Sequence, residues 1–346
     1  MTALFNIAGH QIRPGTHETI DLPIPQLYTH TPMEMPMHII HGKKDGPCLF
    51  VCAAVHGDEI NGVEIIRRLV NQSILKRLRG TLIAIPVINV YGMIHRSRYL
   101  PDRRDLNRSF PGSEKGSLAS RLADLLMTEV ISKATNVIDL HTGAVHRSNL
   151  PQIRGNLEES KTEELARAFG VPVIMHSKVR EGTLRESVAA AGIPIIVYEA
   201  GEALRLDELS IRVGVRGINN VMSALNMLPA KKQGKKKFKP YIALSSSWVR
   251  APISGILLNN TKLGASVKKA EVLGAVADPF GQKHAEINAT YSGVVIGRTH
   301  LPLVNEGDAL IHIAKIDEDL PYEQYVDEIK NQSDRLTKDE NSPAVV

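Results

Sequence analysis

The feature that most constrains the fold is an alternation of apolar and amphipathic segments between residues 37 and 227. Apolar runs of strand length alternate there with amphipathic stretches of helix length, an order typical of an α/β layered domain. The predicted strands are Met37–His41, Pro47–Val55, Thr81–Asn89, Val137–His141, Leu150–Arg154, Val171–His176 and Pro194–Glu199. The predicted helices cover residues 60–76, 117–133, 159–169, 183–191 and 207–227. Several of the strands are apolar almost throughout, which indicates central strands covered on both faces.

The composition changes after residue 228. Residues 229–240 are rich in lysine, and we interpret them as a linker. The following residues, 241–330, show short apolar runs and glycines without a convincing helix, which predicts a β domain. We therefore expect an α/β domain over residues 1–228, the linker, the β domain, and a polar, disordered tail over residues 331–346.

The predicted β domain contains two similar halves. The segment that begins at Ala251 (Ala-Pro-Ile-Ser-Gly-Ile-Leu) is echoed 38 residues later from Ala289 (Ala-Thr-Tyr-Ser-Gly-Val-Val). Two copies of one β unit are indicated, and the pattern resembles the biotinyl/lipoyl type of barrel-sandwich hybrid. In such carrier domains a modified lysine lies near the connecting hairpin. Lys283 falls there, but it does not follow a methionine as the carrier lysine does, so we interpret it as a surface lysine.

The positive charge of the chain is local. The formal net charge is +5, and residues 231–239 alone carry six lysines. A solvated linker explains this stretch, with an anionic partner as the alternative. Its single aromatic residue, Phe238, is too little for base stacking, and we predict no nucleic-acid partner. The apolar windows are too short for a spanning helix and the N-terminus does not resemble a signal peptide, which predicts a cytoplasmic protein without a membrane partner. A homo-oligomer is left open.

Two predicted strands end in residues that commonly bind zinc. His56 and Glu59 follow the second predicted strand, and their spacing at a turn entering a helix puts both side chains on the same side. His141 ends the fourth predicted strand, just before a glycine turn. Two histidines and a glutamate are a ligand set of catalytic zinc, and strand ends are where α/β sheets place ligands. Asp139 could orient a ligand from behind. The alternative for His141 is an imidazole at the edge of the core, bonded to backbone.

Another strand ends in a carboxylate, Glu199, after a run of apolar residues. Burying a carboxylate costs free energy unless the group is used. Beside a zinc site, Glu199 would serve as general base and then pass the proton to the leaving amine. Glu202 is the rival candidate, although its place beyond Gly201 favours a helix-capping or surface role.

The segment 98–112 contains four arginines with little periodicity, which predicts a long loop. Long loops in compact domains are commonly functional. Asn107 and Arg108 can present an amide and a guanidinium to one carboxylate, and an additional arginine can stabilise an oxyanion. The alternative is a solvated loop whose arginines pair with its own aspartates.

Taken together, four motifs resemble the succinylglutamate desuccinylase/aspartoacylase family, which is related to the zinc carboxypeptidases. The motifs are His56-x-x-Glu59, Asp105-x-Asn107-Arg108, Asp139-x-His141-Thr142 and the strand-terminal Glu199. Their order and spacing match the family over roughly residues 37–227, and the β domain also resembles that of the family. The resemblance implies a zinc-carboxypeptidase-like, three-layer α/β/α domain with a mixed sheet, followed by a small all-β domain of the barrel-sandwich type.

The resemblance also implies an activity in amino-acid metabolism. Members of the family are zinc-dependent hydrolases of linear amide bonds, so residues 1–228 would form a catalytic domain. The expected reaction is deacylation, in which a succinyl, acetyl or aspartate-type group is removed from an N-acyl amino acid. One Zn²⁺ per chain would be held by His56, Glu59 and His141.

The same resemblance assigns roles around the substrate. Glu199 would act as the base, while Asn107 and Arg108 would bind the substrate carboxylate. A further arginine of the family polarises the scissile carbonyl, and either Arg98 or Arg104 could correspond to it. Arg98 is slightly favoured because it precedes an aromatic residue.

Two other functions remain open at this point. One is a zinc carboxypeptidase that acts on small peptides. The other is a non-catalytic protein, either one that binds zinc or a ligand or a carrier built around the β domain. Glu199 argues against the binding protein, because binding alone needs no base, and the missing Met-Lys pair argues against the carrier.

Overall fold

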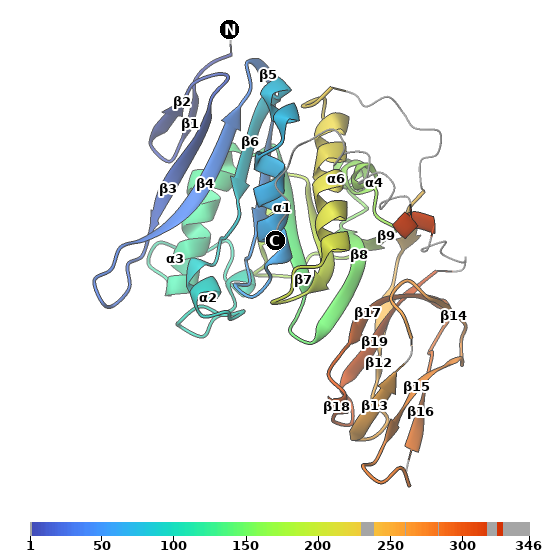
Figure 1. Ribbon diagram of the computed structural model, residues 1–346. Coiled ribbons are helices and arrows are strands. Elements are labelled where there is room, and N and C mark those ends of the chain that lie inside the picture. The colour runs from blue at the N-terminus through green and yellow to red at the C-terminus, as the bar shows by residue number, and fades with distance from the viewer. Residues whose placement is uncertain (1, 230–238, 260, 283, 317–323, 328–346) are drawn as a thin grey trace.

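The computed structural model describes residues 2–229, 239–259, 261–282, 284–316 and 324–327 (Figure 1). The α/β prediction is confirmed, and each predicted strand and helix overlaps an observed one. The strands of this part are β3 (His17–Ile24), β4 (Met33–His41), β5 (Lys44–Ala53), β6 (Arg79–Ile85), β7 (Asn136–Gly143), β8 (Arg147–Gly155), β9 (Val173–His176) and β10 (Ile195–Glu202). The α-helices are α1 (Asn61–Val70), α2 (Val90–Ile94), α3 (Leu118–Leu125), α4 (Ser160–Phe169), α5 (Leu184–Ala190) and α6 (Glu208–Ala224).

Shorter helical turns complete the helical segments. The region predicted as one helix over residues 117–133 consists of α3, a π-helical turn and a 3₁₀ turn. The 3₁₀ turns are η1 (Ser73–Arg77), η2 (Leu106–Arg108) and η4 (Ile131–Lys133), and the π turn is η3 (Leu126–Val130). In the described part of the chain, no helix combines the length and the apolar character that crossing a membrane requires.

The strands form one large mixed sheet with helices on both faces. Strands β10, β7, β5 and β6 are parallel neighbours, whereas β8 runs antiparallel to β10. Helices α1, α4 and α6 pack on one face of the sheet, and α3 and α5 pack on the other. Along β5, Leu49 and Val51 enter the first core while Phe50 and Cys52 enter the second. Burial on both faces is why these strands are almost continuously apolar.

The N-terminal strands lie outside the region where sequence patterns were assigned. Strand β4 begins at Met33, four residues before the predicted strand, and pairs antiparallel with both β3 and β6. In β3, Ile20, Leu22 and Ile24 are buried and alternate with exposed residues. This period of two is the signal that identifies the strand. A separate hairpin of β1 (Phe5–Ile7) and β2 (His10–Ile12) packs beside them.

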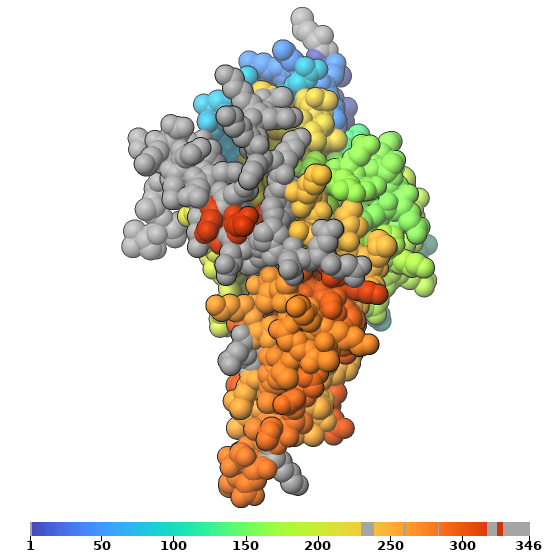
Figure 2. Space-filling model, turned by 90° about the vertical axis from the view of Figure 1, so that its right-hand side faces the viewer, coloured from blue at the N-terminus to red at the C-terminus, as the bar shows by residue number. Residues whose placement is uncertain are grey.

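The C-terminal strands extend the large sheet. They are β11 (Tyr241–Ala243), β12 (Ser246–Arg250), β13 (Gly255–Asn259), β14 (Ser266–Val267), β15 (Val272–Ala277), β16 (His284–Asn288), β17 (Gly293–Thr299), β18 (Leu303–Val304) and β19 (Ala309–Lys315). Strand β17 pairs antiparallel with β8, and β11 pairs parallel with β9. Figure 2 shows the C-terminal strands as a narrow extension at one end of the molecule.

The strand pairing within this extension repeats itself. One sheet contains β12, β19, β17 and β14, and the other contains β16, β15, β13 and β18. Strands β12, β13, β14 and β15 of the first half correspond to β16, β17, β18 and β19 of the second. Each strand pair in one sheet then has an equivalent pair in the other, for example β12–β19 and β16–β15. This repeat agrees with the two similar sequence segments. Residues 230–238 of the predicted linker, Lys283 and the predicted tail lie outside the described residues.

Candidate active site

The turn that carries His56 and Glu59 follows β5 directly. The backbone N–H of Glu59 donates to the His56 carbonyl at 3.1 Å, and this tight turn brings both side chains to one side, as predicted. Gly57 packs against α2, where a Cβ atom would lie 2.1 Å from the carbonyl carbon of Gly92. Any larger residue at position 57 would push the turn away from α2, so glycine fixes the place of both side chains.

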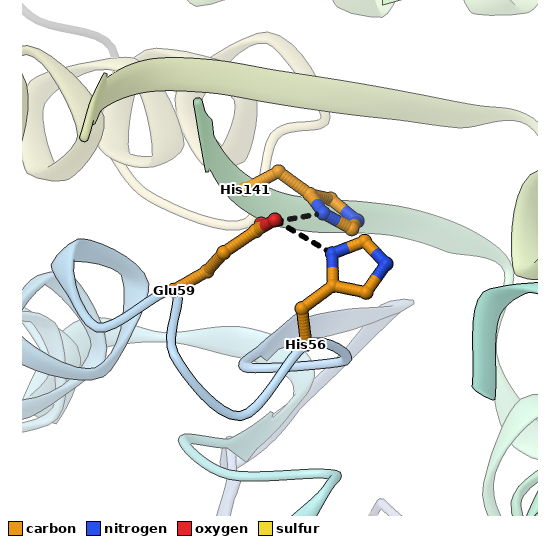
Figure 3. Close-up of side chains that lie close together, drawn as sticks. All are labelled: His56, Glu59 and His141. Atoms are coloured by element: carbon orange, nitrogen blue, oxygen red, sulfur yellow. Dashed lines mark hydrogen bonds and ion pairs between the residues drawn. The ribbon is translucent and has the colours of Figure 1, made fainter. Parts of the chain in front are cut away.

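The carboxylate of Glu59 joins two imidazoles (Figure 3). His56 Nδ1 lies 2.7 Å from Glu59 Oε1, and His141 Nδ1 lies 2.8 Å from Glu59 Oε2. The backbone N–H of Thr142 also donates to Oε2 at 3.0 Å. His141 arrives from the end of β7, and all three side chains are buried. Two separate strand ends therefore converge on one point, as the sequence predicts.

The electrostatics of this cluster favour cations. Burial lowers the pKa of His141, but the carboxylates of Asp139 and Glu59 outweigh it and hold that pKa well above its usual value. For Glu59, burial raises the pKa, but the adjacent His56 and His141 outweigh it and hold the carboxyl pKa below its usual range. The Glu59 carboxylate thus stays ionised and attracts positive charge.

The donor set fits a zinc ion. One ligand atom from each of His56, Glu59 and His141 lies within 4.8 Å of the other two. Imidazole nitrogen and carboxylate oxygen are the ligands of catalytic zinc sites with two histidines and one glutamate. Asp139 contacts His141 Nε2 at 2.7 Å, and Asp105 lies 3.3 Å from His56 Nε2. Each imidazole therefore has a carboxylate behind it, an arrangement that orients metal-binding histidines.

Glu199 lies beside this cluster. It occupies β10 directly opposite His141 of the parallel strand β7, and both line the same cavity. Asn149 Nδ2 donates to Glu199 Oε2 at 2.8 Å, and Arg154 Nε lies 3.6 Å from Oε1. The rival residue, Glu202, is not in the lining of this cavity.

Glu202 has a different structural role from the one the sequence favours. It accepts a hydrogen bond from the His146 backbone at 3.1 Å and another from His300 Nδ1 at 2.9 Å. It neither caps a helix nor lies free on the surface, because these bonds link the β7–β8 connection to the segment after β17.

The arginine-rich segment divides between the site and the surface. Arg98 lines the cavity, where Nη2 donates to Asp105 at 2.9 Å and Nη1 lies 3.4 Å from Glu59. Arg104 does not line it. The Arg104 side chain is 63% exposed and its Nε lies 3.9 Å from Asp102. The structure thus brings only the first of the two candidate arginines, Arg98, to the cluster of His56, Glu59 and His141.

Asn107 and Arg108 also line the cavity. They lie on the 3₁₀ turn η2, where Asp105 caps the turn by accepting from the Asn107 backbone N–H at 2.8 Å. Asn107 Oδ1 accepts from the backbone N–H of Leu184 at 2.9 Å, at the start of α5. The amide oxygen is therefore occupied, and its NH₂ group is the part that can meet a ligand.

The cavity has a volume of about 430 Å³ and is rich in cations. Its lining has three acidic side chains, those of Glu59, Asp139 and Glu199, against seven basic ones. The basic residues are Arg98, Arg108, Arg147, Arg154, Lys178, Arg180 and Arg185. Such a balance attracts anionic ligands.

Five of these cations were not identified from the sequence, namely Arg147, Arg154, Lys178, Arg180 and Arg185. They come from the two ends of β8, the segment after β9, and α5, and only folding brings them together. Arg185 Nη1 and Arg154 Nε are buried and have no hydrogen-bond partner among the described residues. Unsatisfied buried donors of this kind are explained by a ligand or water that accepts from them.

A mixed α/β sheet that carries a buried His–Glu–His set at its strand ends places the chain among α/β proteins with a candidate metal site. The sequence model of the succinylglutamate desuccinylase/aspartoacylase catalytic domain matches residues 45–225, more than half of the chain. The chain therefore belongs to the succinylglutamate desuccinylase/aspartoacylase family.

Individual relatives agree with this assignment. The N-alpha-acetyl-L-2,4-diaminobutyric acid deacetylase of Halomonas elongata is 26% identical over 288 residues, which are 80% of this chain and 84% of the relative. A succinylglutamate desuccinylase/aspartoacylase from Rhodobacter sphaeroides has a similar structure, with a TM-score of 0.77 and 23% identity over 86% of this chain and 95% of its own. The product-bound ectoine utilization protein EutE (DoeB) from Ruegeria pomeroyi has a TM-score of 0.77 and 24% identity, covering 87% and 95%. The two structures support the fold.

Proposed function

We propose that this protein is a zinc-dependent deacylase that hydrolyses the amide bond of N-acyl amino acids. The observation that carries the proposal is that the His56–Glu59–His141 cluster, Glu199 and an excess of basic side chains line one cavity. Family membership and the deacetylase name of the H. elongata relative support the same class of reaction. The proposal includes a zinc-carboxypeptidase-like fold and a catalytic domain over residues 1–228.

The reaction needs a nucleophilic water, a base and an acid. A zinc ion held by His56, Glu59 and His141 would supply a Lewis acid that polarises the scissile carbonyl. Glu199 accepts the proton of the attacking water and then donates it to the leaving amine. Asn149, which donates to Oε2, keeps the carboxylate turned toward the cavity. The proton has only a short way to travel, because Glu199 lies opposite the zinc-site residue His141 on the neighbouring strand.

Three further side chains bind and polarise the substrate. Arg108 and the NH₂ group of Asn107 hold the carboxylate of the amino acid. Arg98 is placed to stabilise the negative charge that develops on the carbonyl oxygen, because it lies beside Glu59 and within the cavity lining. The exposed Arg104 is not placed for this role, and we assign carbonyl polarisation to Arg98.

A hydrolysis screen tests the proposal. The zinc-loaded full-length protein should release the free amine from at least one member of a panel of N-acetyl and N-succinyl amino acids, with N-acetyl-2,4-diaminobutyric acid included. Dipeptides form the second part of the panel. Cleavage of dipeptides alone would favour a carboxypeptidase, and binding without turnover in both parts would favour a non-catalytic protein.

Removal of the Arg108 side chain should weaken substrate binding. A charge-assisted hydrogen bond contributes about 1.5–3 kcal/mol, so Arg108→Ala should raise KM by roughly 10- to 200-fold. An N-acyl amino acid amide, which lacks the carboxylate, should be a poor substrate of the native enzyme. Steady-state kinetics with matched acid and amide substrates measure both effects, and equal turnover of the two substrates would exclude the carboxylate clamp.

A further inference from the structure

Asn61 connects the segment that carries Glu59 to the segment that carries Glu199. It is the first residue of α1, shortly after Glu59, and it is 1% exposed. Asn61 Nδ2 donates to the carbonyl oxygen of Ala200 at 3.2 Å, and Ala200 follows Glu199 directly. Asn61 Oδ1 accepts from the backbone N–H of Asp207 at 2.9 Å. One buried amide thus bonds both to the residue after the candidate base and to the N-cap residue of α6.

Regular strand pairing does not continue past Glu199. The register of β10 against β7 shifts between Glu199 and Glu202, and its register against β8 shifts between Glu199 and Gly201. Bulges of this kind are common next to active sites, where they redirect a side chain. Gly201 has a φ of +74°, and a Cβ atom there would lie 2.4 Å from Asn61 Nδ2. The bulge therefore packs directly against the Asn61 amide at the point where the strand pairing becomes irregular.

Backbone hydrogen bonds hold the residues that follow the bulge. The carbonyl of Asp58, in the turn before α1, accepts from the N–H of Leu204 at 2.8 Å. The carbonyl of Gly143, at the end of β7, accepts from the N–H of Ala203 at 2.9 Å. The bond from Asn61 reaches a residue closer to the candidate base than either of these. It is also made by a side chain, so a substitution can remove it.

We infer that Asn61 is a positioning residue that sets the place of the Glu199 carboxylate relative to Glu59 and its two histidines. The inference rests on the proposed function, in which Glu199 takes a proton from water. Asn61 is not part of the cavity lining, so it acts through the backbone of β10 and not on the substrate. Without its N–H donor, the buried Ala200 loses a hydrogen bond and the bulge can shift. A displacement of about 1 Å at reacting groups can lower a rate about 100-fold.

Asn61→Leu keeps the size of the side chain and removes both hydrogen bonds. It should lower kcat by about 10- to 100-fold, with KM within about threefold of the native value, because the groups that bind the substrate carboxylate lie on another segment. The zinc content should stay unchanged, because both imidazoles and Glu59 remain. Asn71→Leu is the matched control at the other end of α1, where Asn71 Nδ2 donates to the Arg67 carbonyl at 2.7 Å, and it should keep the native kcat. Native kcat in Asn61→Leu, or an equal loss in Asn71→Leu, would overturn the inference.

Asn61→Asp tests the bond to Ala200 by itself. Its carboxylate can still accept from the Asp207 N–H, but an ionised carboxylate has no hydrogen to donate to Ala200. The start of α6 keeps its partner, so this variant should fold even where the leucine variant does not. Its kcat should fall by about tenfold or more with the zinc retained. Native kcat in Asn61→Asp would show that the bond to Ala200 does not position the base.

A double-variant cycle separates positioning from general damage. If Asn61 acts through Glu199, its replacement should matter little once the base is absent. Asn61→Asp should therefore change the residual kcat of Glu199→Gln by less than about twofold, although it lowers the kcat of the native enzyme by about tenfold or more. Full additivity of the two losses would show that Asn61 affects the rate by another route and would overturn the inference.

Hydrogen exchange tests the Asn61 link without turnover. The Asp207 N–H is bonded to Asn61 in the native protein, so peptides over residues 200–207 should exchange about tenfold faster or more in Asn61→Leu. A peptide of β3, at the far edge of the sheet, should exchange as in the native protein. If no N-acyl amino acid is hydrolysed but this pattern holds, the deacylase proposal fails and the link stands. If the native enzyme is active but the exchange of residues 200–207 is the same in Asn61→Leu, the inference fails and the proposed function stands.

Discussion

Replacement of Glu199 by glutamine should lower kcat by about 100-fold or more. Glutamine keeps the shape of the side chain, and its amide oxygen can still accept the hydrogen bond that Asn149 donates to Glu199. It cannot accept the proton of the attacking water, and general base catalysis contributes roughly 100- to 10,000-fold in rate. The loss should therefore fall on kcat, with the zinc content unchanged. Steady-state kinetics and metal analysis of the same preparation measure the two quantities.

Glu202→Gln is the matched control for this experiment. Glu202 lies three residues further along β10, but its carboxylate is bonded to the His146 backbone and to His300 outside the cavity. Its replacement should change kcat far less than that of Glu199. Full activity in Glu199→Gln, or a larger loss in Glu202→Gln, would place the base elsewhere.

The sequence predicted the α/β part of the fold because burial leaves a clear periodicity there. Central strands such as β5 are apolar on both faces, and α1 and α6 show a single apolar stripe. The sequence analysis did not predict strands β1, β2 and β3, although the alternation of Ile20, Leu22 and Ile24 marks β3. The pairing of β17 with β8 could not be predicted from the sequence. Strand edges pair through backbone hydrogen bonds, and these form with almost any sequence of side chains.

The candidate site was predictable to a different extent on its two sides. The side with His56, Glu59, His141 and Glu199 follows from ionisable residues at the ends of apolar strands. The other side, with Arg147 and Trp248, consists of residues that are far apart in the sequence and belong to no short motif. Arginine in a loop or on a strand end is usually solvated, so only the folded chain shows which arginines share a cavity.

The choice between Arg98 and Arg104 illustrates the same limit. Both lie in one segment, and the sequence favours Arg98 only through its aromatic neighbour. The structure separates them because Asp105 forms an ion pair with Arg98 beside Glu59, whereas Arg104 extends into solvent. In a loop without regular periodicity, the spacing of residues in the sequence does not show which side chains point into the cavity and which point into solvent.

The purified protein should contain about one zinc per chain, lose activity with a chelator and regain it when zinc is added. Zinc should also raise the melting temperature, because a ligand that binds only the folded state stabilises it. Loss of a partner behind a ligand typically lowers metal affinity 10- to 100-fold, so Asp139→Asn should fall in that range. His56→Ala, which removes a ligand, should lower the affinity further and abolish tight binding.

The double variant His56→Ala, His141→Ala decides whether these residues form the site. It should contain no stoichiometric zinc and show no shift of the melting temperature with added zinc, because a single carboxylate, Glu59, would remain from the cluster. His10→Ala removes an exposed histidine of β2 instead and should keep both the zinc and the shift. Both readouts are independent of activity, so they separate a wrong metal site from a wrong substrate. Stoichiometric zinc in the double variant would show that the metal binds elsewhere and that the Glu59 cluster has another role.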